Sequence, residues 1–120
     1  MGYLLDTYAM VEIIKGNKNY AVFLDKEIFT NLLNLYELYF ILLRDYDEEK
    51  AKKYFSYFRR FSLDTLDSHI FGASKFKLEN NKLNLSYADC LGYAMALEND
   101  LKFLTGDKEF EKFNNVEFVK

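Results

Sequence analysis

The sequence has little of the chemistry that stabilises small secreted proteins or binds zinc. Only one of its 120 residues is cysteine, so no internal disulfide can form, which fits a reducing cytoplasm. Zinc prefers histidine and cysteine ligands, and the chain offers only His69 and Cys90, which we interpret as ordinary helix residues. Proline is absent, and no function follows from its absence.

Long apolar runs and a strong net charge are also missing. The most apolar stretch, residues 38–43, is far too short to span a bilayer. The first residues lack the basic and apolar segments of a signal peptide, so we expect a cytoplasmic protein with no membrane association. The net charge of -3 argues against a protein that holds nucleic acid by bulk positive charge alone.

Apolar and aromatic residues, by contrast, are abundant. Half of the residues are apolar, with 12 phenylalanines and 10 tyrosines, whereas disordered chains are poor in aromatics. A chain of this length fits one folded unit, and no linker-like segment divides it. We therefore expect a single domain spanning residues 1–120.

Short apolar runs alternate with longer periodic stretches. The short runs predict strands at residues 3–5, 27–30, 61–65, 102–105 and 116–119. The longer stretches predict helices at residues 8–15, 19–24, 32–43, 47–60, 66–80 and 86–100. Alternation of this kind is typical of a parallel sheet covered on both faces. The expected fold is α/β, with three α/β/α layers and a mostly parallel five-stranded sheet.

Four acidic residues stand out by their positions. Asp6 and Asp107 follow predicted strands, and Asp89 lies in the first turn of a predicted helix. Glu37 is the only charged residue of the apolar helix at 32–43. Ligands of open parallel sheets bind beyond the carboxyl ends of the strands, so we expect these side chains to meet there.

Three of these acids also have a purely structural explanation. Asp6 and Asp107 suit helix N-caps, and Asp89 completes a capping-box pattern that begins at Ser86. Glu37 has no such explanation, because a carboxylate among apolar residues needs a partner or a metal. Converging carboxylates without basic partners repel one another, and a divalent cation removes that conflict. Oxygen ligands alone favour Mg²⁺ or Mn²⁺.

Four segments together resemble a known family. Their order and spacing are similar to those of the PIN-domain ribonucleases and, within them, of the VapC-type toxins of toxin–antitoxin pairs. The segments are Tyr3-Leu4-Leu5-Asp6-Thr7, Asn34-Leu35-Tyr36-Glu37-Leu38, Leu85-Ser86-Tyr87-Ala88-Asp89 and Phe103-Leu104-Thr105-Gly106-Asp107-Lys108-Glu109-Phe110.

The resemblance implies a PIN-like fold and a metal-dependent endoribonuclease that hydrolyses RNA phosphodiester bonds. It implies that the catalytic and metal-binding residues are Asp6, Glu37, Asp89 and Asp107, with Thr105 as a supporting hydroxyl. The implied cofactor is Mg²⁺ or Mn²⁺. The implied partners are an RNA substrate, a cognate antitoxin protein and a second copy of the chain.

Two positions depart from the family pattern. Tyr8 stands where the family often has asparagine, and Gly106 stands where it often has a basic or polar residue. Tyr8 either stacks on a base beside the site or is a core or interface tyrosine. Neither departure removes a carboxylate.

Two further expectations concern the surface. An acidic site needs nearby cations to hold RNA, and the candidates are Lys15, Lys18, Lys50, Lys52, Lys53, Arg59, Arg60, Lys75 and Lys77. The helices at 32–43 and 47–60 have more apolar surface than a small domain can bury. Because exposed apolar patches usually mark interfaces, we expect one or both helices to form a homodimer.

Three other readings remain. A non-catalytic PIN-like scaffold that binds RNA or protein would have the same acids. A receiver-like signalling domain also clusters acids at strand ends, but the paired acids that it needs early in the chain are missing. A haloacid-dehalogenase-type phosphatase needs a second aspartate two residues after the first, and that position is Tyr8.

Overall fold

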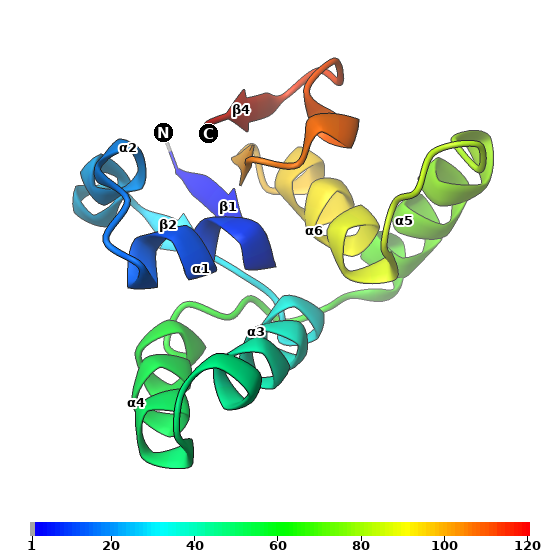
Figure 1. Ribbon diagram of the computed structural model, residues 1–120. Helices are drawn as coiled ribbons and strands as arrows, with labels where there is room; N and C mark the ends of the chain where they lie inside the picture. The colour runs from blue at the N-terminus through cyan, green and yellow to red at the C-terminus, as the bar shows by residue number, and fades with distance from the viewer. Residues whose placement is uncertain (1) are drawn as a thin grey trace.

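The computed structural model describes residues 2–120, and its centre is a parallel sheet. The strands are ordered β2-β1-β3-β4, so the first and third strands in the chain lie in the middle (Figure 1). Leu4 pairs with Phe29 on one side and with Phe103 on the other. The strands are β1 (Tyr3–Leu5), β2 (Ile28–Phe29), β3 (Lys102–Thr105) and β4 (Val116–Phe118).

Helices cover both faces of this sheet. Successive side chains of a strand point to opposite faces, so the apolar residues of β1 and β3 contribute to two separate buried clusters. Leu4 and Phe103 belong to one buried cluster with residues of α5 and α6, whereas Leu5 and Leu104 belong to a second cluster with residues of α1, α3 and α4. The helices are α1 (Thr7–Ile14), α2 (Lys18–Ala21), α3 (Leu32–Asp45), α4 (Glu48–Arg59), α5 (Asp67–Glu79) and α6 (Tyr87–Glu98), with single 3₁₀ turns η1 (Val22–Asp25) and η2 (Lys108–Phe110).

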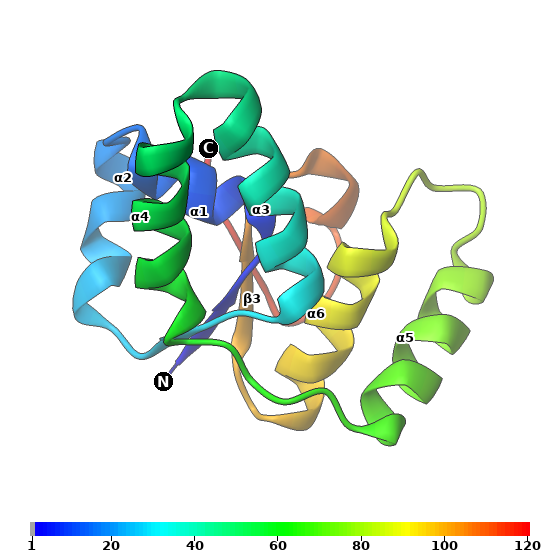
Figure 2. The same cartoon turned by 90° about the horizontal axis from the view of Figure 1, so that it is seen from below.

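The expected three-layer α/β fold is therefore confirmed. Figure 2 shows α4, α3, α6 and α5 following one another across the molecule. Within residues 2–120, no helix combines the length and the apolar character that crossing a bilayer requires.

The predicted strand at 61–65 is wrong. Only one parallel bridge forms there, between Thr30 and Ser62, with the Leu63 N–H donating to the Thr30 carbonyl at 2.9 Å. The neighbouring strand β2 has only two residues, so it offers little edge to pair with. The chain is exposed from residue 64 and turns into α5. The sheet consequently has four strands rather than five in the described part of the chain.

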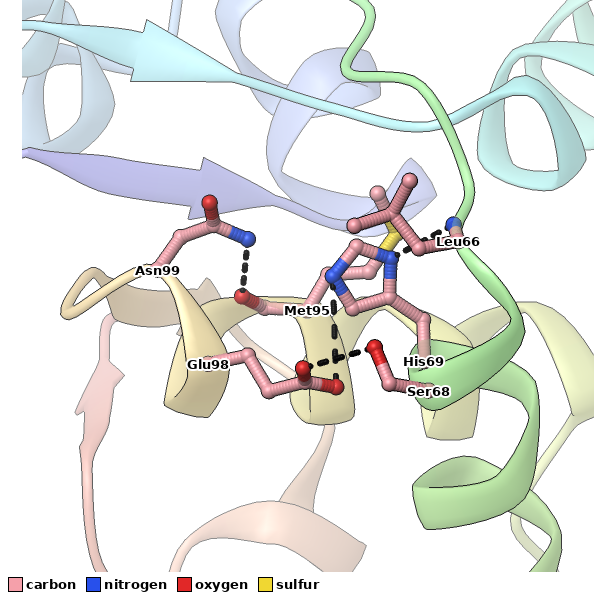
Figure 3. A network of polar contacts seen from close by, with 6 residues as sticks. All are labelled: Leu66, Ser68, His69, Met95, Glu98 and Asn99. Atoms are coloured by element: carbon pink, nitrogen blue, oxygen red, sulfur yellow. Dashed lines mark hydrogen bonds and ion pairs between the residues drawn. The ribbon is translucent and has the colours of Figure 1, made fainter.

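His69 has a structural role at the start of α5, in agreement with its interpretation as an ordinary helix residue. Its buried ring accepts a hydrogen bond at Nδ1 from the Leu66 N–H at 3.0 Å, which satisfies a donor of the first turn (Figure 3). Its Nε2 lies 3.9 Å from the Glu98 carboxylate, which also accepts from the Ser68 hydroxyl. These contacts join the start of α5 to the last residue of α6, whereas Asp89 lies in the first turn of α6.

Candidate active site

The four predicted acids line one pocket of about 830 Å³. Asp6 follows β1 and Asp107 follows β3, so two adjacent parallel strands bring them to the same edge of the sheet. Asp89 reaches the pocket from the first turn of α6, and Glu37 reaches it from α3. Residues from four different parts of the chain therefore border the same pocket.

Thr105 links two of the acids. Its buried hydroxyl donates a hydrogen bond to Asp6 Oδ2 and accepts one from the Asp107 N–H at 3.0 Å. The other Asp6 oxygen accepts from the Ala9 N–H at 2.8 Å and caps α1. Asp6 is therefore held at both oxygens, which fixes the direction in which its carboxylate faces.

A second network holds the other two acids. The Thr7 hydroxyl donates to Glu37 Oε1 at 2.8 Å and accepts from the Asn34 amide at 3.0 Å. The same amide nitrogen lies 3.4 Å from Asp89 Oδ1. Asn34 is fully buried, and its side-chain oxygen is without a hydrogen-bond partner among residues 2–120.

Thr7 and Asn34 were not predicted as site residues, although both lie in segments that resemble the family. Asn34 carried a usable signal, because it lies three residues before Glu37 and shares its helix face. A polar amide on the buried side of an apolar helix needs partners, so it points to other polar groups nearby.

The helix-capping explanation holds for Asp6 and Asp107, and only in part for Asp89, whose N–H rather than carboxylate takes part in the cap of α6. Asp107 Oδ1 accepts from the Glu109 N–H at 3.0 Å, so Asp107 caps η2 as Asp6 caps α1. Ser86 caps α6 through the Asp89 N–H at 3.0 Å. Capping uses only one oxygen of Asp6 or Asp107, and it does not turn either residue away from the pocket.

The pocket places negative charges close together. Burial raises the pKa of Asp6 well above its usual value, and the charges of Asp89 and Asp107 raise it further against the opposing hydrogen bond from Thr105. Burial and then the charge of Glu37 raise the pKa of Asp89 to about 6. None of the four acids forms an ion pair within 4.0 Å of a lysine or arginine in residues 2–120.

This donor set suits a hard divalent cation by its chemistry. All four side chains offer carboxylate oxygens, and their mutual repulsion is what a cation would relieve. Among residues 2–120, no three histidine, cysteine, aspartate or glutamate side chains already converge closely enough to hold a metal ion. A cation bound by three or more of them would therefore require their side chains to move.

The two departures from the family pattern prove to be one structural feature. A β-carbon on Gly106 would lie 2.1 Å from Tyr8 Cε1, far inside van der Waals contact. The ring of Tyr8 occupies the space that a side chain at position 106 would take. Glycine is needed there because of this close approach, and both residues line the pocket.

The cations of the pocket are not the predicted ones. Arg44, Lys108 and Lys120 line it, whereas none of the nine proposed lysines and arginines does. The Lys120 ammonium group lies over the Tyr8 ring, 5.4 Å from its centroid. These three residues come from the end of α3, from η2 and from the segment after β4, so sequence proximity to the acids would not have identified all of them.

Solved structures share this fold over almost the entire chain. A toxin–antitoxin complex from Klebsiella pneumoniae has a TM-score of 0.76 at 17% identity, covering 96% of this chain and 95% of that one. VapBC2 from Rickettsia felis, bound to a DNA fragment from its promoter, has a TM-score of 0.76 at 20% identity, with coverages of 99% and 98%. VapBC-1 from nontypeable Haemophilus influenzae has a TM-score of 0.75 at 16% identity, with coverages of 99% and 97%.

At these identities the likeness establishes the fold alone. A comparison with curated protein sequences gave no significant match. The family model described as "PIN domain", however, matches residues 3–116, which include all four acids and both hydrogen-bond networks. The chain therefore belongs to the PIN domain family, whose members are generally nucleases.

Proposed function

We propose that this chain is a metal-dependent endoribonuclease and the toxin of a VapBC-type toxin–antitoxin pair in the cytoplasm. The observation that carries the proposal is that Asp6, Glu37, Asp89 and Asp107 line one pocket, and that none of them has an ion-pair partner within residues 2–120. Membership of the PIN domain family and the likeness to VapBC structures support it.

The side chains take distinct roles in this proposal. Asp6, Asp89 and Asp107 hold Mg²⁺ or Mn²⁺, directly or through water, and Glu37 holds the ion or orients the attacking water. Thr105 is a positioning residue, because its hydroxyl fixes the Asp6 carboxylate. Thr7 is the corresponding positioning residue for Glu37.

The bound ion supplies activation of water and neutralisation of charge on the phosphate. The protein supplies orientation, since the buried Asp6 carboxylate is held at both oxygens by Ala9 and Thr105. Lys108 and Lys120 offset the repulsion between the acidic pocket and an approaching RNA backbone, whereas the charge of Arg44 is already paired with Asp45.

The rival function is a non-catalytic scaffold with the same fold. It is favoured by the absence, in residues 2–120, of a ready-made group of three metal ligands. The two are separated by incubating the purified protein with a structured RNA and Mg²⁺ or Mn²⁺. Cleavage that EDTA abolishes supports the nuclease, whereas Mn²⁺ binding without any cleavage supports the scaffold.

Exposed apolar side chains on α3 support the proposed protein partners. Tyr36 is 75% exposed and Phe40 is 63% exposed, and both border the acidic pocket. An apolar groove of about 440 Å³ continues from Tyr36 between α3 and α4. We propose this surface for the antitoxin or for the second copy of the chain, because unpartnered apolar surface of this kind is typical of interfaces.

A further inference from the structure

The Tyr8 ring borders the acidic pocket directly. Tyr8 lies two residues after Asp6, in the first turn of α1, and its half-buried side chain lines the same pocket as Asp6 and Asp107. An aromatic ring beside a group of acids does not contribute to metal binding. It does offer a flat apolar surface next to the place where a phosphodiester would be cut.

The place of this ring is fixed by its surroundings. Gly106 leaves a space into which the ring edge fits, with a hypothetical β-carbon 2.1 Å from Cε1 and 2.6 Å from Cζ. Behind it, the Tyr20 ring centroid lies 6.2 Å from that of Tyr8. A held ring loses little conformational entropy when a ligand stacks on it.

A cation accompanies the ring. The exposed Lys120 side chain places its ammonium group over the Tyr8 ring and also lines the pocket. Base stacking on an aromatic side chain beside a backbone-binding cation is how proteins hold single-stranded nucleic acids without reading sequence. The cation also brings positive charge to a pocket that otherwise repels phosphate.

We propose that Tyr8 and Lys120 form a nucleotide-binding subsite beside the acids. The base next to the scissile phosphate displaces the Lys120 ammonium group from over the Tyr8 ring and stacks there, and the ammonium group contacts the adjoining phosphate. This inference rests on the proposed ribonuclease function and deepens it. The ligand class is single-stranded RNA, held with little preference among the bases because every base has a π-face.

The first test separates stacking from packing. Tyr8→Phe keeps the ring, whereas Tyr8→Leu keeps apolar bulk but loses the π-face. With single-stranded RNA as substrate, Tyr8→Phe should leave KM unchanged and Tyr8→Leu should raise it roughly tenfold with kcat nearly constant, as expected for a contact outside the reacting atoms. Equal KM values for the two variants would overturn the stacking role.

The second test needs no cleavage. The sequence has no tryptophan, so Tyr8→Trp introduces the only one at the subsite, and its fluorescence is excited at wavelengths that the tyrosines do not absorb. Combined with Asp89→Asn to prevent turnover, it is titrated with a six-residue oligoadenylate and with an abasic oligomer of the same backbone. Quenching by the oligoadenylate alone supports base stacking, and equal quenching by both overturns it. Adding Lys120→Ala should weaken binding of both oligomers severalfold, and unchanged binding would remove Lys120 from the subsite.

The two tests distinguish a failure of the Tyr8 subsite from a failure of the proposed ribonuclease function. A wild-type protein that cuts RNA while the Tyr8→Trp variant shows no base-dependent quenching retains the nuclease function and loses the subsite. Base-dependent quenching of the variant, found together with a wild-type protein that cuts no RNA, retains the subsite and fits the scaffold instead.

Discussion

Burial raises the pKa of the Asp6 carboxyl group, and the negative charge of Asp89 raises it further across the end of the sheet. The two residues belong to α6 and to the end of β1, so this repulsion exists only in the folded chain. A fold that keeps such a repulsion has a cost in stability when no cation is present.

The pH dependence of stability should reveal that cost. The folded-state pKa of Asp89 is raised from 3.8 to about 6, so its contribution favours the fold at pH 4 and is lost as the pH rises through 6. In EDTA, Asp89→Asn should therefore gain stability over the wild type between pH 4 and pH 7. The gain is at most about 3 kcal/mol and smaller to the extent that solvent reaches the side chain.

Thermal denaturation in EDTA across this pH range measures the effect. Adding Mg²⁺ at pH 7 should raise the melting temperature of the wild type more than that of Asp89→Asn. A constant difference between the two proteins from pH 4 to pH 7 would contradict the electrostatic account.

The contact between Gly106 and Tyr8 gives a prediction about packing. Gly106→Ala places a methyl group where the Tyr8 ring lies, and it should destabilise the fold by about 1–3 kcal/mol. In a Tyr8→Ala background the same change should cost far less, because the obstructing ring is gone. Gly72→Ala is the matched control, since its β-carbon would meet only Ala94, at 3.8 Å.

Urea denaturation of the two single variants and the double variant completes this cycle. If the changes in the free energy of unfolding of the two single variants add up to that of the double variant, the cost of Gly106→Ala does not depend on the Tyr8 ring. That result would contradict a fixed position of the ring against Gly106.

The Thr105 hydroxyl gives a prediction about positioning. Thr105→Val keeps the shape of the side chain but removes the hydrogen bond to Asp6 and the acceptor for the Asp107 N–H. We expect a loss of about 1–3 kcal/mol in stability and a lower kcat, because the Asp6 carboxylate is no longer oriented. A variant with wild-type kcat, measured by RNA cleavage at saturating Mg²⁺, would show that Thr105 positions nothing that catalysis needs.

The exposed face of α3 gives a prediction about assembly. Light scattering at micromolar concentration should show a homodimer, and Phe40→Glu should convert it to a monomer because a charge in an apolar interface lacks a partner. Phe71→Glu, at an equally exposed phenylalanine of α5, is the matched control. A wild-type monomer would contradict the homodimer, and dissociation by Phe71→Glu alone would move the interface to α5.

The sequence was informative where a residue's role depends on its position along the chain. Asp6 and Asp107 follow strands, and chain order alone brings the ends of parallel strands to one edge. Contacts between distant segments could not be predicted in this way. The fit of Tyr8 against Gly106 depends on where α1 lies relative to the end of β3, and Lys120 reaches the pocket only because β4 lies beside β3. The predicted strand at 61–65 is wrong for a related reason. The apolar pattern of the segment does not reveal that its neighbour β2 has only two residues and offers too little edge for pairing.

Cleavage of RNA by Asp6→Asn tests the central claim most directly. Asparagine keeps the size of the side chain and can still accept the Ala9 N–H, so a purely capping role predicts almost no change. The catalytic role predicts a rate at least about a thousandfold lower, which corresponds to about 4 kcal/mol of lost transition-state stabilisation. The assay uses a structured RNA with Mg²⁺ or Mn²⁺, EDTA as the control and thermal denaturation to verify folding. A well-folded Asp6→Asn protein that cuts as fast as an active wild type would contradict the account and leave Asp6 as a helix cap alone.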